Sequence, residues 1–441
     1  MGSSHDAGLE RDPAFLGLRS GIGLVVANMV GAGIFLSAGF MAQELSAGWI
    51  LLAWCIGALL AMTGARVYAE VAFLIPRSGG EYRYLSELFH PALGYLAGWA
   101  SLLVGFSAPT AISAYGAAAF FFTVSGDGDA RIGATAIVVV LALLHAAGLR
   151  TSRRSQNFLV ILKGALVLGF IAVGLYFGEN QWPTWQPASR ARGVGLPLAT
   201  SLLFVAYAFS GWNAAAYATE EFEAPRRNVP RAMLIGCALV GIAYLLVNWV
   251  LVANLTPARA AIVFEYEESR VTLAHLVASD FLGNAASRAV SIGIAAVLIS
   301  STSAMLLIGP RVYSEMAHDG FLPNWLRGAP GTPPRAAIVL QAVLAVALLY
   351  LHTVGELLSN VAGVLIFFSG LVAIGLFRVK RHRTDLPAPR RSALVAAAVY
   401  AASSGWLLFV AFRNQTGLVP WVALAIGAAL VFYALTQRRL S

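Results

Sequence analysis

Residues 28–35 read Asn28-Met29-Val30-Gly31-Ala32-Gly33-Ile34-Phe35 and lie in the middle of the first apolar stretch of the chain, residues 15–40. Glycine inside a helix costs about 1 kcal/mol relative to alanine. Two glycines that flank one alanine therefore predict a break in a helix that is otherwise long enough to cross a membrane.

A second break is predicted in residues 196–219, which read Tyr207-Ala208-Phe209-Ser210-Gly211-Trp212-Asn213 near their middle. Unwound backbone is tolerated inside a bilayer only where protein or a cavity satisfies its polar groups. Breaks at corresponding positions of two repeats indicate the substrate site of a transporter. Close helix packing by small residues is the alternative explanation.

The composition is that of a polytopic, all-α membrane protein. Of 441 residues, 59% are hydrophobic and only 12% are charged, whereas soluble domains carry about 25% charged residues. Disordered proteins, disulfide scaffolds and ordinary cytosolic enzymes are thereby excluded. We predict twelve spans, at residues 15–40, 49–75, 93–123, 131–149, 157–178, 196–219, 232–254, 286–310, 336–352, 356–377, 394–412 and 418–436.

The distribution of charge gives a predicted orientation. The net charge is +9, from 30 Lys and Arg against 21 Asp and Glu. If the N-terminus lies inside, most of the basic residues fall in inner segments, as is typical of cytoplasmic loops. We therefore predict an integral protein of the plasma (inner) membrane with both termini in the cytoplasm, and no nucleic-acid partner.

The breaks fall in the first and sixth predicted spans, which indicates two repeats of five helices. Because five is odd, the second repeat inserts inverted relative to the first. The predicted segments are a cytoplasmic tail (1–14), the first repeat (15–178), the inverted repeat (196–377), two further spans (394–436) and a cytoplasmic tail (437–441).

The ends of interrupted helices have a definite chemistry. A helix that restarts inside the membrane offers free amides and the positive end of its dipole to a carboxylate. Carbonyl groups freed at the break suit an ammonium group, so the two together suit a zwitterionic amino acid. The sequence contains no metal-binding or hydrolase motif, and we predict neither a cofactor nor an enzymatic activity.

Four motifs occur in order along the chain, namely Gly31-Ala32-Gly33-Ile34-Phe35, Ile75-Pro76-Arg77-Ser78-Gly79-Gly80-Glu81-Tyr82, Phe209-Ser210-Gly211-Trp212-Asn213, and Pro310-Arg311-Val312-Tyr313-Ser314-Glu315-Met316-Ala317-His318-Asp319-Gly320-Phe321-Leu322-Pro323. With them the chain resembles the amino acid–polyamine–organocation (APC) superfamily, especially the L-type amino acid transporters and related bacterial permeases. The resemblance implies the leucine-transporter fold and alternating access.

The resemblance also implies a substrate site. The amides of Ala32 and Gly33, which follow Gly31, would hold the carboxylate. The ammonium would bind the carbonyls of Met29, Tyr207 and Ser210, beside Gly211, and the Tyr207 ring would close over the substrate. The chain departs from the family twice, because Ala32 replaces a frequent Ser and Tyr207 replaces the Phe that is common in the L-type branch.

Lys163 is alone among apolar residues in the fifth predicted span. Intramembrane ionisable residues are costly and are candidates for function. In sodium-independent members of the superfamily that the chain resembles, such a lysine replaces a sodium ion and bridges helix one to helix eight. Candidate partners are Ser300, Ser301, Thr302 and Ser303, of which Ser303 is preferred. A purely structural tie and a lysine that extends to the inner surface are alternatives.

Charged residues at the inner ends of the spans are candidates for a gate. Arg66 and Glu70 are four residues apart, so they share a helix face and predict a local ion pair. The alternative is an inner gate that they form with Arg77, Glu81 or Glu220.

These patterns predict a secondary transporter of neutral L-amino acids that needs no sodium and is either proton-coupled or an exchanger. No acidic residue is predicted near the site, where a cationic side chain would require one. The alternatives are an amino-acid sensor or partner-dependent subunit on the same scaffold, and a permease for cationic amino acids or polyamines. The predicted partners are the amino acid, the lipid bilayer and, for proton coupling, protons; the oligomeric state stays open.

Overall fold

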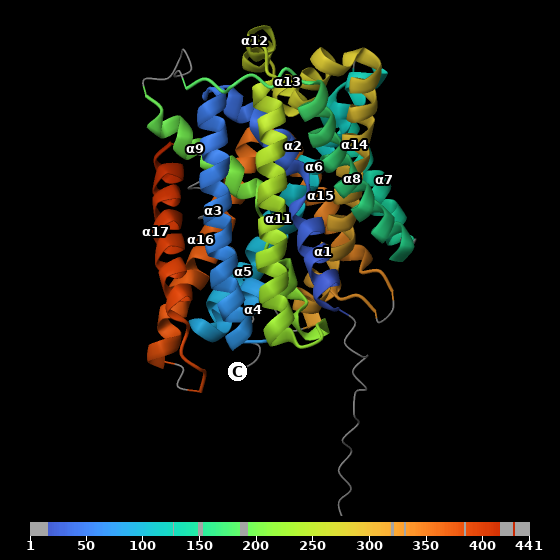
Figure 1. Cartoon of the computed structure of the whole chain (residues 1–441). Helices are drawn as coiled ribbons and strands as arrows, with labels where there is room; N and C mark the ends of the chain where they lie inside the picture. The colour runs from blue at the N-terminus through green and yellow to red at the C-terminus, as the bar shows by residue number, and fades with distance from the viewer. Residues whose placement is uncertain are drawn as a thin grey trace, which may run out of the picture.

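The structure is a computed structural model that describes residues 16–126, 128–148, 153–185, 193–318, 322–329, 332–382, 385–414 and 427. Most of its long helices stand side by side in one bundle (Figure 1). The described residues contain no strand, and one isolated bridge pairs Leu16 with Phe222. The all-helical prediction is confirmed for this part of the chain.

The helices are α1 (Leu18–Met29), α2 (Ala32–Ala42), α3 (Ala47–Leu74), α4 (Gly80–Leu88), α5 (Pro91–Ala100), α6 (Ala108–Ser125), α7 (Ala130–Ala146), α8 (Arg153–Phe177), α9 (Gly195–Ala208), α10 (Ala214–Tyr217), α11 (Pro225–Ala253), α12 (Pro257–Glu265), α13 (Glu267–Val271), α14 (Leu273–His318), α15 (Arg335–Leu351), α16 (Val354–His382) and α17 (Arg391–Asn414). A π-helical segment, Ser101–Ser107, joins α5 to α6. Single 3₁₀ turns lie at Thr219–Glu221 and Asn324–Leu326.

Seven helical segments of the described chain are long and apolar enough to cross a membrane: Leu18–Ala42, Ala47–Leu74, Pro91–Ser125, Pro225–Ala253, Leu273–His318, Val354–Val379 and Arg391–Arg413. Four shorter apolar helices accompany them, at Ala130–Ala146, Ile161–Phe177, Gly195–Ala208 and Arg335–Leu351. The predicted tails 1–14 and 437–441 lie outside the described residues, as does the predicted span 418–436 apart from Gly427.

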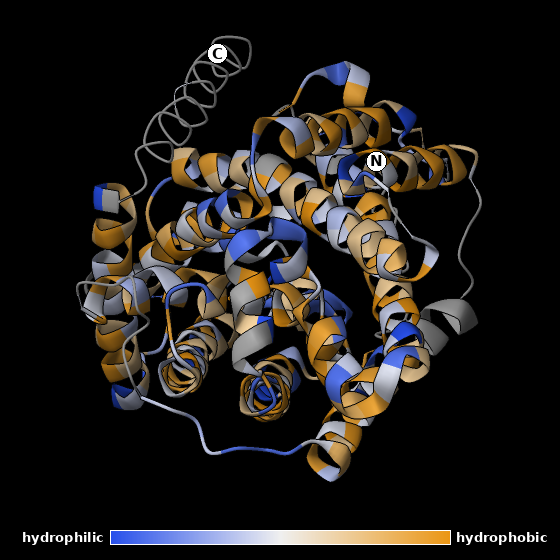
Figure 2. Cartoon of the chain, turned by 90° about the horizontal axis from the view of Figure 1, so that it is seen from above, coloured by the Kyte–Doolittle hydropathy of each residue, from blue (hydrophilic) through white to orange (hydrophobic). Residues whose placement is uncertain are grey.

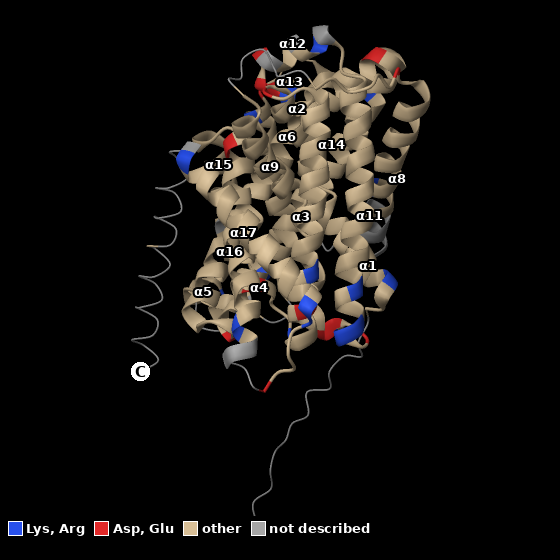
Figure 3. Ribbon diagram, turned by 60° about the vertical axis from the view of Figure 1, so that its left-hand side comes forward, with Lys and Arg blue, Asp and Glu red and all other residues tan. Residues whose placement is uncertain are grey.

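The surface of the bundle fits a lipid environment. Apolar residues dominate the helices in the view from above (Figure 2). Leu59, Ile161 and Phe409 are each more than 60% exposed on outward faces. Charged residues gather mainly at the two ends of the bundle (Figure 3). A long uncharged belt between charged ends is what a bilayer requires, so the chain is an integral membrane protein.

The first span is broken where the glycines predict. Helix α1 ends at Met29, and α2 begins at Ala32. Between them Val30 has φ −73° and ψ 94°, and Gly31 has φ −143° and ψ −149°, so both are extended. We call these two residues the first break. Its position confirms the predicted interruption of the first helix.

The sixth span is broken as well. Turns at residues 209–213, called here the second break, separate α9 from α10. Gly211 has φ +97°, a conformation that side chains with a Cβ atom avoid. A side chain at this position would also lie 2.9 Å from the Asn28 carbonyl oxygen. Glycine is therefore required here by conformation and by space, and the second break packs directly on the end of α1.

Residues 257–285 form α12, α13 and the first turns of α14, at the upper end of Figure 1. Helix α14 bends at Gly283, which has φ 72° and ψ 176°. Arg270 of α13 donates a 3.2 Å hydrogen bond to Gln43, and its carbonyl group packs against Gly39. Helix α13 therefore covers the C-terminal end of α2.

Candidate functional site

The N-terminus of α2 is tightly packed at Gly33 and borders free space at Gly31. Ala32 and Gly33 are buried, and any side chain at Gly33 would clash with the backbone of Ala208 in α9. Gly31 differs, because a Cβ atom added there would meet no atom within 4 Å. Close packing therefore explains Gly33, whereas Gly31 borders free space beside the unsatisfied amides of the helix end.

Two of the three carbonyl groups predicted to bind an ammonium already have protein donors. The hydroxyl of Tyr244, on α11, donates to the Met29 carbonyl at 2.6 Å. The Ser210 amide donates to the Tyr207 carbonyl at 2.9 Å. Each carbonyl oxygen keeps a second lone pair for a ligand. Tyr244 was not identified from the sequence because it is distant in the chain and lies in an ordinary apolar stretch.

Lys163 is buried in α8, with 8% of the residue exposed. Its ammonium donates a 2.8 Å hydrogen bond to Ser301 of α14, and Ser301 in turn donates to the Val297 carbonyl at 3.1 Å. Among the described residues, Lys163 makes no hydrogen bond to α1. The contact therefore joins α8 to α14, and a lysine that extends to the inner surface is excluded.

The preference for Ser303 as the partner of Lys163 is wrong. Ser303 Oγ lies 2.9 Å from Nε2 of His145, on α7. Ser301 and Ser303 are two residues apart in one helix, so they point in different directions and meet different neighbours. Ser300 makes no hydrogen bond to Lys163 either, within the described part of the chain. The run of hydroxyl residues at 300–303 correctly predicted that α14 contacts Lys163, but it did not predict which face of α14 makes the contact.

Arg66 and Glu70 form the ion pair that their spacing predicts, with 2.9 Å between Nη1 and Oε2. Arg66 also donates to Ser392 at 3.0 Å, and Glu70 accepts the Arg390 amide at 2.9 Å. Both partners lie at the start of α17 or just before it. The pair thus ties α3 to α17, which supports the local structural explanation over a gate.

Glu81 occupies a different position, directly beside the second break. Its carboxylate accepts hydrogen bonds from the Tyr68 hydroxyl at 2.8 Å, the Asn213 amide at 2.5 Å and the Tyr217 hydroxyl. These donors come from α3, from the second break and from α10. No described Lys or Arg forms an ion pair with Glu81. One carboxylate therefore holds the second break and α10 against α3 and α4.

The other residues predicted for the gate are more exposed. Glu220 has an exposed side chain, and its backbone amide donates a 2.9 Å hydrogen bond to the Ser78 hydroxyl. Arg77 pairs with Glu87 at 3.4 Å, with 60% of the Arg77 side chain exposed. Surface pairs of this kind contribute little to stability. Of the predicted set, Glu81 is the residue whose side chain hydrogen-bonds to the second break within the described part of the chain.

We expect Glu81→Gln to lower the free energy of unfolding by roughly 2 kcal/mol and to slow transport, because hydrogen bonds to a charged group contribute about 1.5–3 kcal/mol. Chemical denaturation and substrate uptake measure the two effects. Glu220→Gln is the matched control, since its side chain is exposed and should change neither quantity. Equal effects of the two substitutions would contradict the role given to Glu81.

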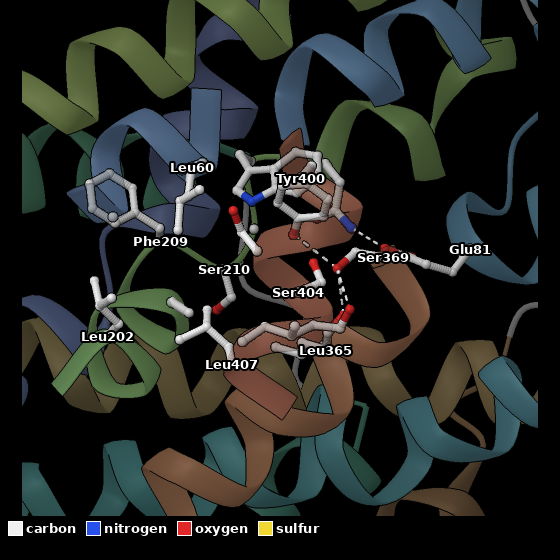
Figure 4. A pocket seen from close by; sticks show the side chains of 18 residues that line it. Leu60, Glu81, Leu202, Phe209, Ser210, Leu365, Ser369, Tyr400, Ser404 and Leu407 are labelled. Carbon is white, nitrogen blue, oxygen red and sulfur yellow. Dashed lines mark hydrogen bonds between the residues drawn. The ribbon is translucent and has the colours of Figure 1, made fainter. Parts of the chain in front are cut away.

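A cavity of about 80 Å³ lies against the second break, between α3, α9, α16 and α17 (Figure 4). Glu81 lines it together with Gly57, Leu60, Ala61, Leu202, Ala206, Phe209, Ser210, Gly211, Trp212, Asn213, Leu365, Ile366, Ser369, Tyr400, Ser403, Ser404 and Leu407. The expectation that no acidic residue lies near the site is therefore wrong on this side of the break. Gly79 and Gly80, with φ 119° and 54°, let the chain reverse into α4 and bring Glu81 there.

Comparison with known proteins places these features in a family. A family model described as amino acid permease matches residues 16–435. The b(0,+)-type amino acid transporter 1 of Mus musculus is 27% identical, over 95% of this chain and 87% of its own length. The large neutral amino acids transporter small subunit 2 of Homo sapiens is 26% identical, over 93% and 78%. The cystine/glutamate transporter of Pongo abelii is 28% identical, over 87% and 77%.

Proposed function

Because the chain belongs to the amino acid permease family of membrane transporters, we propose that it carries neutral L-amino acids by alternating access without sodium. The observation that carries the proposal is the contact between the two broken helices, with free space at Gly31 beside the amides of α2. The family consists of transporters rather than enzymes, and its relatives act on different amino acids by name. Membership of the family therefore does not fix the substrate class, which depends on the residues of the site.

In the proposed site, the amides of Ala32 and Gly33 bind the substrate carboxylate. The positive end of the α2 dipole supports this role, because α2 begins there and has no side-chain cap. The carbonyls of Met29, Tyr207 and Ser210 bind the ammonium, the first two through the lone pair that their protein donor leaves free. The Tyr207 ring, 6% exposed at the end of α9, closes over the substrate.

Lys163 is proposed as the fixed cation that replaces sodium. Its burial and its hydrogen bond to Ser301 support this role, because a charged group in the membrane is costly unless it is paired. A fixed positive charge between α8 and α14 would repel a sodium ion from the same place. Transport would then draw on a proton gradient or on exchange of one amino acid for another.

We also propose the leucine-transporter fold, with twelve spans in two inverted repeats of five followed by two more. The breaks in the first and sixth spans support it, since each lies at the start of a predicted repeat. The proposed location is the plasma membrane with cytoplasmic termini, as the predicted distribution of Lys and Arg favours.

Transport of cationic amino acids is the second candidate. It is favoured by Glu81, which lines the cavity beside the second break and has no ion-pair partner among the described residues. Its negative charge would favour a cationic substrate through its electric field, across the backbone of the second break and without direct contact. The relative named as a transporter of large neutral amino acids favours the first candidate instead.

Ligand-dependent thermal stability in sodium-free buffer tests these candidates. A neutral amino acid at 100 times its Kd should stabilise the purified protein by about 2.7 kcal/mol. Its N-acetyl derivative, which lacks the ammonium, should not stabilise it. If cationic amino acids stabilise the protein and neutral ones do not, the second candidate replaces the first. A shift that requires sodium would contradict the role of Lys163.

A further inference from the structure

We propose that the cavity behind the second break binds a small aliphatic ammonium compound, at a site separate from that of the transported amino acid. The cavity lies between α3, α9, α16 and α17 (Figure 4). No described residue of α1 or α2 lines it. The site is thus distinct from the proposed carboxylate site at the N-terminus of α2.

The backbone of the second break separates the two sites. Gly211 packs so closely on α1 that a Cβ atom would lie 2.9 Å from the Asn28 carbonyl oxygen and 3.2 Å from the Met29 nitrogen. No ligand atom fits between these segments, because non-bonded carbon atoms need about 3.5–4.0 Å. A molecule in the cavity would therefore contact Ser210 and Gly211 of the second break without contacting α1 or α2.

Hydroxyl groups without partners line the cavity. Ser404 is only 4% exposed, and its hydroxyl makes no hydrogen bond to any described residue. Ser210 likewise has no side-chain hydrogen bond within the described chain. Ser369 shows the contrast, since its hydroxyl bonds the Tyr400 hydroxyl at 2.9 Å and the Leu365 carbonyl at 2.7 Å. The hydroxyls of Ser404 and Ser210 are therefore available to hydrogen-bond a polar group of a ligand in the cavity.

The charge of the residues that line the cavity determines which sign of charge a ligand can carry. Glu81 lines the cavity, and its three hydrogen-bond donors, Tyr68, Asn213 and Tyr217, are all neutral. The cavity lining contains no Lys or Arg. A carboxylate can accept about four hydrogen bonds, so one position stays free for an ammonium. A ligand with its own carboxylate would be repelled by Glu81 at low dielectric.

The remaining lining is apolar and sets the size of the ligand. Leu60, Leu202, Leu407 and Phe209 form the wall away from Glu81. A volume of about 80 Å³ gives room for roughly five to eight groups of the size of water. A short branched amine such as isobutylamine matches this lining in kind and in size, because it combines an ammonium group with a small apolar body.

Thermal stability of the purified full-length protein with isobutylamine, isobutanol and isobutyrate tests the proposal. We expect isobutylamine to raise the melting temperature in a saturable manner, isobutanol to bind about tenfold more weakly or worse, and isobutyrate to have no effect. Ser404→Leu fills the cavity and should weaken amine binding at least about tenfold. Leu407→Phe, one turn further along α17, should do the same if Ser404→Leu does not fold.

Ala402→Leu is the matched control, because Ala402 is exposed on the outer face of the same helix and its substitution should leave amine binding unchanged. Neutral amino acids should stabilise all three variants as they stabilise the wild type. If amino acids fail to bind while the amine binds, the proposed function fails and this site stands. Amine binding that Ser404→Leu and Leu407→Phe leave intact, competition between amine and amino acid, or no saturable shift would each overturn the proposal.

Discussion

Replacement of Lys163 by methionine should reduce amino acid uptake by about 10- to 100-fold, because a hydrogen bond to a charged group contributes about 1.5–3 kcal/mol. The protein should still fold. Methionine is similar in length and fills the same buried space. Ser301 keeps its 3.1 Å hydrogen bond to the Val297 carbonyl, so the substitution leaves no hydroxyl without a partner. Uptake into proteoliposomes at matched protein content measures the effect.

Two serines of α14 provide the matched comparison. Ser301→Ala removes the acceptor of Lys163 and should lower uptake nearly as much as Lys163→Met. Ser303→Ala removes the contact with His145 instead, and should lower uptake less. Full activity of Lys163→Met, or equal effects of the two serine substitutions, would show that the contact between Lys163 and Ser301 is a structural tie without a role in transport.

Gly31→Val should weaken amino acid binding by a factor of 100 or more, since loss of both carboxylate hydrogen bonds to the α2 amides removes about 3 kcal/mol or more. The backbone at Gly31 accepts valine, because its φ of −143° is extended and an added Cβ atom meets nothing within 4 Å. The two methyl groups would occupy the space where the carboxylate is proposed to bind. Ligand-induced thermal stabilisation measures the loss.

Gly23→Val is the control for this experiment. Gly23 lies in α1 and also has nothing within 4 Å of an added Cβ atom, so its substitution should leave binding intact. Gly33→Val should abolish binding too, but it should also destabilise the fold by its clash with Ala208. If Gly31→Val binds amino acids normally, the carboxylate does not sit at the N-terminus of α2.

The sequence predicts the breaks because their cause is local. Glycine tolerates extended and left-handed backbone and favours helix less than other residues do, so Gly31 and Gly211 mark the ends of helices wherever the chain packs. The same reasoning predicts the ion pair of Arg66 and Glu70, since one helix sets their distance. The all-helical class follows from the long apolar stretches, because a helix in lipid satisfies all of its backbone hydrogen bonds within one segment.

Contacts between helices were predicted less well because they depend on rotation about each helix axis. The hydroxyl run on α14 offers four neighbouring candidates, and only the packing of α8 selects Ser301 for Lys163. Tyr244 reaches Met29 across 215 positions of sequence. Glu81 reads as a residue of an inner loop, and its approach to Asn213 depends on the turn at Gly79 and Gly80. None of these contacts has a local sequence pattern.

The measurement that tests the central claim most directly is uptake of radiolabelled leucine into proteoliposomes with all sodium replaced by choline. The account predicts undiminished uptake by the wild type under a proton gradient or with amino acid preloaded inside, and uptake near background for Lys163→Met and Gly31→Val. Uptake that disappears with sodium would contradict the role of Lys163. Binding of leucine without any flux would instead identify the protein as a sensor or as a subunit that needs a partner.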